Sequence, residues 1–129
     1  MIDSRLIKIA SNTKYYGLKD KFTFKTNLKN SKCGDKISME IIVNKNIIKE
    51  LRYETEACIF CEASASVLAD IVKNKSIKTF KQNLNKYLNM KKEKAPKIYK
   101  NLNFLLSKKY KNRKDCTLLP LRAFYKAVK

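Results

Sequence analysis

The sequence predicts an α+β fold, in which a three-stranded antiparallel sheet carries helices packed on one of its faces. Two observations carry this prediction. Apolar and polar residues alternate through much of the stretch 22–55, which is the period of strands, whereas apolar residues recur every three or four positions from residue 57 onward. The chain has 129 residues and shows no internal repeat or long linker, so we expect one domain over residues 1–129.

The first expected element is a short amphipathic helix. Its apolar residues are Ile2, Leu6, Ile7 and Ile9, and the polar stretch 12–17 should end it. Three strands follow, and their order along the chain predicts an antiparallel meander with a turn at 44–46. The alternating residues are Phe22, Phe24 and Thr26 in the first strand, Ile37, Met39, Ile41 and Val43 in the second, and Leu51, Tyr53 and Thr55 in the third.

Four helices are expected after the sheet. The first follows Glu56, the second contains 77–87, the third begins near Pro96, and the last begins around 117–120. Their apolar stripes are Phe60, Ala63, Val67 and Ile71, then Ile77, Phe80, Leu84 and Tyr87, then Tyr99, Leu102 and Leu106, and finally Leu121, Phe124 and Val128. Strands followed by helices place all of these helices on one face of the sheet.

The chain is strongly basic, with 30 Lys and Arg against 11 Asp and Glu and a formal net charge of +19. Such a charge makes a nucleic-acid-binding module an alternative function, and the segment 108–114 interleaves Tyr110 with cations. The lysines are spread from Lys8 to Lys129 together with many Asn and Ile residues, as an A/T-rich codon bias would produce. A solvated surface is therefore the favoured interpretation, and specific nucleic-acid binding is not expected.

No apolar run reaches the roughly 20 residues that a membrane helix needs. The N-terminal stretch also lacks the apolar segment and cleavage site of a secretory signal. We therefore expect a cytoplasmic protein without a membrane partner. That compartment keeps thiols reduced, so the four cysteines are better interpreted as metal ligands or reactive thiols than as disulfides. The chain has no histidine, which leaves thiolates and carboxylates as ligands.

Three cysteines are expected in similar places, namely Cys33 between two strands, Cys58 at the start of a helix and Cys116 just before the last helix. Backbone N–H groups and the helix dipole favour thiolates at helix N-termini. Asp35 would add an oxygen ligand from the loop of Cys33, across Gly34. Three thiolates and one carboxylate suit a tetrahedral zinc site or a labile iron-sulfur site.

The cysteines also allow other interpretations. Buried cysteines often pack as small hydrophobic residues, and this is the interpretation favoured for Cys61. The pair Cys58 and Cys61 forms a CxxC motif, but a single CxxC is a weak sign of zinc or redox chemistry. A purely structural zinc domain is a third alternative, in which removal of the metal would unfold the chain.

The chain resembles the NifU/IscU/SufU family of iron-sulfur cluster assembly scaffolds. The matching stretches are Asn30-Ser31-Lys32-Cys33-Gly34-Asp35, Ala57-Cys58-Ile59-Phe60-Cys61-Glu62-Ala63-Ser64-Ala65-Ser66 and Arg113-Lys114-Asp115-Cys116-Thr117-Leu118. They occur in the family's order and span nearly the whole chain. The resemblance implies a SufE/NifU-like fold and a protein that is a scaffold or sulfur carrier and not an enzyme.

The chain is most similar to the SufU type. Its last two cysteines are 116 − 58 = 58 residues apart, which leaves room for the helical insertion of that type. Asp115 stands where the IscU type has a histidine. The resemblance implies that Cys33, Asp35, Cys58 and Cys116 bind zinc, an iron-sulfur cluster or both, that Cys33 accepts persulfide sulfur, and that Arg113 lies near the metal. It implies a SufS-like cysteine desulfurase as one partner, and downstream assembly machinery or apo-proteins as others.

Overall fold

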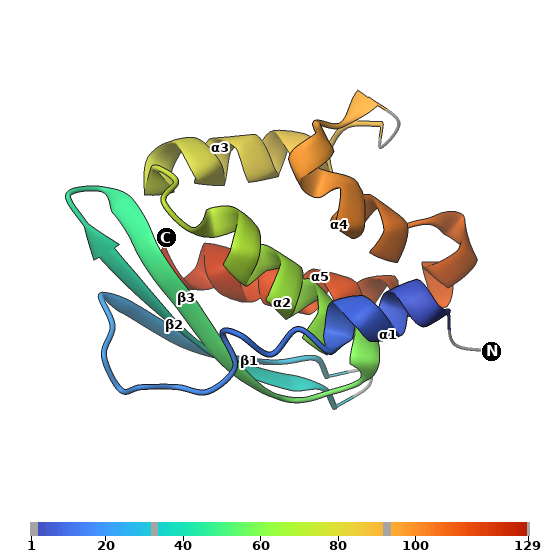
Figure 1. The fold of residues 1–129 in the computed structure, drawn as a ribbon, viewed down its shortest axis with the longest axis horizontal. Helices are drawn as coiled ribbons and strands as arrows, with labels where there is room; N and C mark the ends of the chain where they lie inside the picture. Colours follow the sequence, from blue (N-terminus) through green and yellow to red (C-terminus); the bar gives the residue numbers. More distant parts are fainter. Residues whose placement is uncertain (1–2, 32–33, 92–93, 129) are drawn as a thin grey trace.

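The computed structural model describes residues 3–31, 34–91 and 94–128. One helix comes first, a sheet follows, and the remaining helices come after the sheet (Figure 1), as the sequence predicts. The elements are α1 (Ser4–Ala10), β1 (Phe24–Lys29), β2 (Lys36–Asn44), β3 (Ile47–Glu56), α2 (Ile59–Val72), α3 (Ile77–Leu88), the 3₁₀ turn η2 (Lys97–Tyr99), α4 (Lys100–Leu105), the 3₁₀ turn η3 (Lys108–Arg113) and α5 (Lys114–Ala127).

The three strands form an antiparallel sheet in the order β1-β2-β3, which confirms the predicted meander. Met39 in the middle strand pairs with Thr26 on one side and with Tyr53 on the other. Lys45 and Asn46 form the turn between β2 and β3, with φ angles of 51° and 67°. Two successive positive φ values match the twist of a two-residue hairpin, so this turn sets the register of the pair.

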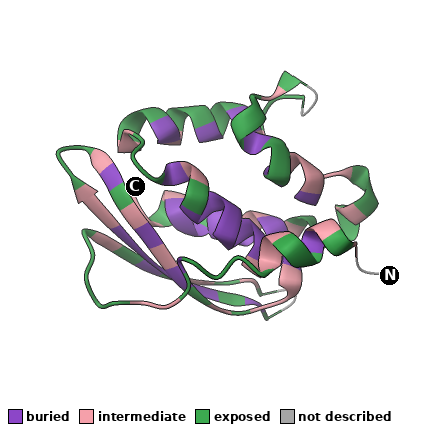
Figure 2. Cartoon of the chain, in the orientation of Figure 1, coloured by how far each residue is buried: buried purple, intermediate pink, exposed green. Residues whose placement is uncertain are grey.

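The helices lie on one face of the sheet, as predicted (Figure 1). α5 packs against β1 and β2, α2 packs against β3, and the two helices also pack against each other. α1 and α4 then pack against α2, so α2 lies in the middle of the molecule and is buried along most of its length (Figure 2). Its small residues, from Ala63 to Ser66, are all buried and let neighbouring elements approach closely.

The segment 17–23 runs along the opposite face of the sheet. Glu40 of β2 points into this segment and is only 2% exposed. Its carboxylate accepts hydrogen bonds from the backbone N–H groups of Lys19 and Asp20, at 2.9 and 3.1 Å. Arg52 of β3 donates through Nε to the carbonyl oxygen of Gly17 at 2.6 Å. A buried carboxylate and a guanidinium thus hold a polar loop over the face that the helices leave open.

The third helix differs from its prediction. The chain after Pro96 first makes the 3₁₀ turn η2, and α4 begins only at Lys100. Leu105 is fully buried, whereas the predicted Leu106 is half-buried. Tyr99 and Leu102 are buried as predicted, but α4 ends at Leu105, so Leu106 caps the helix and does not continue its apolar stripe. The stacked rings of Tyr87 and Tyr99, 4.0 Å apart, join this region to α3.

The basic segment 108–114 forms η3 and the start of α5, and it does not present an aromatic platform. The ring of Tyr110 packs edge-on against Phe60 at 4.9 Å and against Phe104 at 5.6 Å, measured between ring centroids. A ring held in such a cluster is not available to stack on a base. The interleaving of Tyr110 with lysines therefore reflects packing of η3 onto α2 and α4.

Candidate metal centre

The loop between β1 and β2 positions Asp35. The N–H of Asn30 donates to the carbonyl of Asp35, and the N–H of Gly34 donates to the carbonyl of Asn30, both at 2.8 Å. Gly34 has a φ of +77°, a conformation that other residues adopt only with strain. Apart from its two chain neighbours, a Cβ at Gly34 would meet no described atom within 4 Å. Glycine is therefore needed here for the backbone conformation of the turn.

The carboxylate of Asp35 is buried, with 8% of the residue exposed. Its Oδ2 atom has no hydrogen-bond partner among the described residues. A buried carboxylate oxygen without a donor is costly, because it loses its water and gains no compensating bond. Such an oxygen is well suited to bind a cation.

Cys58 is the residue that precedes α2, as the sequence predicts. Its backbone is extended, with φ −72° and ψ 168°, and its carbonyl oxygen accepts hydrogen bonds from the N–H groups of Cys61 and Glu62. Its side chain makes no capping hydrogen bond, so the sulfur is not used to satisfy the helix end. The residue is half-buried and lies where the helix dipole favours negative charge.

Cys116 lies inside the first turn of α5, not before it. The helix begins at Lys114, whereas the sequence placed its start around 117–120. Pro120 lies in the interior of the helix, where its missing N–H cannot bond the carbonyl of Cys116. The result is a buried thiol, 5% exposed, in the first turn of a helix that packs on the sheet.

The fold brings Asp35, Cys58 and Cys116 together. One carboxylate oxygen and the two Sγ atoms all lie within 4.8 Å of one another. Ligands of one tetrahedral zinc ion, bound at about 2.0–2.3 Å, lie roughly 3.3–4 Å apart, so small side-chain adjustments would close this group around a metal. Two sulfurs and one oxygen suit zinc or iron and leave one coordination position. The group fits a metal, and the unpartnered Oδ2 of Asp35 supports this fit.

The other predicted site residues are placed differently. Cys33 lies outside the described residues, so its predicted place in the site stays a prediction. Cys61 is fully buried in the core and is not part of the group, which confirms its interpretation as a core residue. Arg113 directly precedes α5 and is exposed, and its side chain makes no hydrogen bond or ion pair with the described residues. Its role near a metal stays a prediction.

In the described part of the chain, no helix has both the length and the apolar character that crossing a membrane requires.

Comparisons with known proteins agree with the geometry. The iron-sulfur cluster assembly scaffold protein IscU of Thermotoga maritima is 29% identical over 70 residues, which cover 54% of this chain and 49% of that protein. The zinc-dependent sulfurtransferase SufU of Bacillus subtilis is 33% identical over 52 residues, 40% of this chain and 35% of that protein. An uncharacterized protein of Borreliella burgdorferi is 33% identical over 99 residues, 77% of this chain and 67% of its own length. The matches therefore span half or less of the two relatives with a named function.

A solved structure shares the whole fold. The crystal structure of a putative iron-sulfur cluster assembly scaffold protein for the SUF system, from Fervidobacterium islandicum, superposes with a TM-score of 0.82 at 20% identity. The superposition covers 99% of this chain and 96% of that one. The model of the family described as the NifU-like N-terminal domain matches residues 3–128. The chain therefore belongs to the NifU-like N-terminal domain family.

Proposed function

We propose that this chain is an iron-sulfur cluster assembly scaffold of the SufU type, acting as one domain in the cytoplasm. The observation that carries the proposal is the approach of Asp35, Cys58 and Cys116 to within 4.8 Å of one another. These residues come from a hairpin loop and two helix starts that are far apart in the sequence. Family membership and the fold shared with a scaffold of the SUF system support the same conclusion.

In this proposal Cys33, Asp35, Cys58 and Cys116 form the complete ligand set. A bound zinc ion would supply charge that keeps the thiols deprotonated. The carboxylate of Asp35 is the hardest of the four ligands and would keep the site exchangeable. A nascent iron-sulfur cluster would be cargo of the same residues, held and then passed to downstream machinery or an apo-protein.

Cys33 is the proposed sulfur acceptor. Its thiolate would attack the outer sulfur of a persulfide on a SufS-like cysteine desulfurase, forming a new S–S bond while the desulfurase thiolate leaves. After the exchange Cys33 would carry the persulfide, and no oxidant or reductant would be consumed. The chain carries sulfur in this scheme and is not an enzyme itself.

The region between Cys58 and Cys116 supports the SufU type. It contains α3, η2, α4 and η3 in addition to α2, which is enough helical chain to include the insertion proposed for that type. The insertion packs on the helical layer, where Tyr125 of α5 donates a 3.0 Å hydrogen bond to the carbonyl of Lys81 in α3. This region therefore packs on the helical layer, while α5, which contains Cys116, remains packed on the sheet.

Anaerobic reconstitution tests the proposal. The protein is loaded with zinc, and separately with iron, cysteine and a cysteine desulfurase, and metal content and visible absorption are measured. The same is done with Cys116→Ser and with Cys61→Ala as a matched control, because Cys61 is a thiol outside the group. One zinc per chain that requires Cys116 but not Cys61 supports a sulfur carrier, and a Cys116-dependent brown cluster that moves to apo-ferredoxin supports a scaffold.

Stimulation of a cysteine desulfurase by the cysteine variants is the measurement that can contradict the proposed function. If Cys33→Ser, Cys58→Ser and Cys116→Ser all stimulate the desulfurase as well as the original chain, the proposed function is wrong. Circular dichroism after removal of the metal by a chelator distinguishes this function from that of a purely structural zinc domain, which would unfold. The described core is built from apolar residues of the sheet and helices, so we expect the chain to lose its metal and remain folded.

A further inference from the structure

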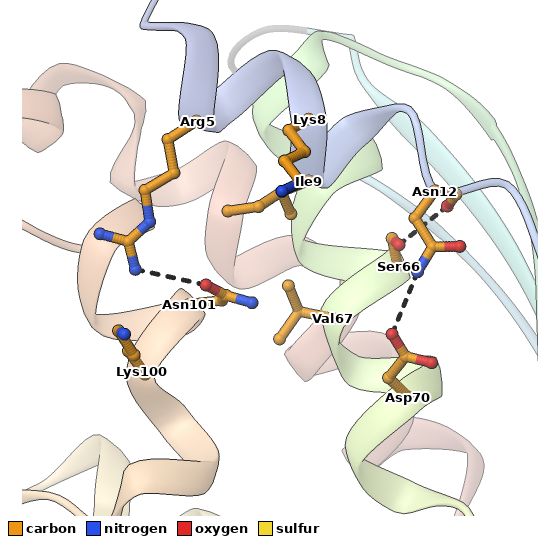
Figure 3. Close-up of a pocket in the computed structure, with 9 residues that line it drawn as sticks. All are labelled: Arg5, Lys8, Ile9, Asn12, Ser66, Val67, Asp70, Lys100 and Asn101. Atoms are coloured by element: carbon orange, nitrogen blue, oxygen red, sulfur yellow. Dashed lines mark hydrogen bonds between the residues drawn. The ribbon is translucent and has the colours of Figure 1, made fainter.

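A cavity of about 700 Å³ opens between α1, α2 and α4, and its lining contains none of the residues of the metal centre. Arg5, Lys8 and Lys100 line one part of it, Asp70 lines another, and Ile9 and Val67 contribute apolar surface. Figure 3 shows Arg5 and Lys100 on one side and Asp70 on the other, with Val67 between them. No sequence motif predicts this cavity, because its lining comes from three separate segments of the chain.

The cationic side contains an arginine that is already held in place. The guanidinium carbon of Arg5 lies 4.3 Å from the ring centroid of Phe104, and its NH2 donates to Oδ1 of Asn101 at 3.3 Å. Stacking and hydrogen bonding orient the planar group before any ligand arrives, which reduces the entropy lost on binding. An oriented guanidinium on the same side of the cavity as Lys100, with Lys8 also in the lining, suits a phosphate group (Figure 3).

The acidic side is also ordered by hydrogen bonds. Oδ2 of Asp70 accepts from Nδ2 of Asn12 at 3.1 Å, and the carbonyl of Asn12 accepts from the hydroxyl of the buried Ser66 at 2.9 Å. Asp70 is exposed, and its described hydrogen bond uses Oδ2 alone, so Oδ1 remains available to accept a hydrogen bond from a ligand. A carboxylate in this position accepts hydrogen bonds well from sugar hydroxyls, as acidic residues do from ribose in nucleotide sites.

We propose that this cavity binds a small sugar phosphate of about the size of a mononucleotide. Arg5, Lys8 and Lys100 would bind the phosphate, and Asp70 would accept a hydrogen bond from a sugar hydroxyl. The side chains of Ile9 and Val67 would contact the sugar or base. The volume lies within the range of about 300–1,000 Å³ typical of small-molecule sites and exceeds what an inorganic phosphate would fill. The proposal is independent of the metal centre.

The main competing explanation is diffuse attraction of any anion to a chain with a net charge of +19. The substitution Asp70→Asn distinguishes the two explanations, because they predict opposite changes in the affinity for the ligand. This substitution raises the net charge by one, so diffuse attraction predicts tighter binding of an anion. A direct hydrogen bond from a hydroxyl to the carboxylate predicts weaker binding, by about tenfold, because a bond to a charged group is lost.

The test is calorimetric titration with AMP, ribose 5-phosphate, adenosine and pyrophosphate at about 0.15 M salt, where long-range attraction is screened. We expect AMP or ribose 5-phosphate to bind, with affinity lowered by Asp70→Asn and by Lys100→Gln. Lys45→Gln is the matched control, because it removes the same charge from the exposed β2–β3 turn and should leave affinity unchanged. Equal binding of the two phosphates would assign the site to the sugar phosphate, and binding of AMP alone would assign it to the nucleotide.

Three outcomes would overturn the proposal. The first is that neither AMP nor ribose 5-phosphate binds, the second is that Lys45→Gln weakens binding as much as Lys100→Gln, and the third is that Asp70→Asn strengthens binding. Circular dichroism of each variant shows whether the fold is kept. Asp70 and Lys100 are exposed, so we expect these substitutions to leave it intact.

Discussion

Ser64 of α2 donates a buried hydrogen bond of 2.6 Å to the carbonyl oxygen of Thr117 in α5. Thr117 directly follows Cys116, and Ser64 lies on the same helix that begins after Cys58. The bond therefore joins the helix that follows Cys58 to the helix that contains Cys116. We expect this packing contact in the core to help position the two thiols of the proposed metal centre.

Ser64→Ala should lower both stability and metal affinity. The substitution removes the donor from a buried carbonyl, which costs about 1–3 kcal/mol of unfolding free energy. Loss of this supporting contact should also weaken zinc binding by about tenfold. Ser66→Ala is the control, since Ser66 bonds to Asn12 instead of α5 and should lower stability while leaving zinc affinity unchanged. Equal zinc affinities in both variants would show that the contact with Thr117 does not position the thiols.

Asp35→Asn should stabilise the metal-free protein and destabilise the metal-bound form. The carboxylate is buried with one oxygen unpartnered among the described residues, so removing its charge should raise the unfolding free energy by about 1 kcal/mol. The same change removes the oxygen ligand, so the stabilisation gained on adding zinc should shrink. Urea unfolding with and without zinc measures both effects. A less stable metal-free variant would mean that the carboxylate has a favourable partner.

Gly34→Ala should strain the loop that carries Asp35. A φ of +77° costs a residue with a Cβ about 1–2 kcal/mol, and asparagine tolerates this region better than alanine. We therefore expect unfolding free energy to fall in the order glycine, asparagine, alanine, and zinc affinity to follow the same order. Denaturant titration and competition with a zinc chelator give the two series. Equal stability of Gly34→Ala and Gly34→Asn would contradict the assignment of strain.

Tyr87 should make the fold sensitive to alkaline pH. Burial raises the pKa of its phenol above the ordinary value of 10.0, and a hydrogen bond of 2.6 Å joins the hydroxyl to Oδ1 of Asn103. Because the folded pKa is raised, the stability it contributes is present below pH 10.0 and is lost as the pH rises above that value. Burial also raises the pKa of Tyr53 and of Tyr99, so both phenols add to this loss.

Urea unfolding on both sides of this pH checks the prediction. Tyr87→Phe should be less stable at neutral pH, because the partner of Asn103 is lost, but should lose less stability between neutral and alkaline pH. An identical pH dependence in the variant and the original chain would mean that Tyr87 does not contribute to it.

The sequence predicted the elements whose signal is local. The alternation of apolar and polar residues predicts the three strands. The hairpin at Lys45 and Asn46 has the positive φ values of a two-residue turn. The start of α2 at Ile59 was also foreseen, because Cys58 stands at the change of period. These features depend on neighbouring residues, so one sequence is enough to predict them.

Other features depend on contacts between distant segments. The start of α5 was misplaced because Pro120 is accommodated inside a helix packed on the sheet. The sequence does not predict that Leu105 is buried in place of Leu106, because nothing local shows that α4 ends at Leu105. The resemblance pointed to Asp35, Cys58 and Cys116 as neighbours, and the structure places them together, but their binding of a metal stays a prediction. The cavity that contains Arg5 and Lys100 could not be predicted from a sequence pattern, since the two residues meet only through folding.

Asp35, Cys58 and Cys116 lie far apart along the chain, and this affects the order in which they become available during translation. Asp35 and Cys58 emerge from the ribosome early, but Cys116 joins them only when α5 has left the exit tunnel and docked on the sheet. An incomplete chain would therefore present isolated thiols that hold a metal weakly. Capture of a metal would therefore require every element from the β1–β2 loop to α5, and a nascent chain without α5 would not draw on the cell's supply of zinc or iron.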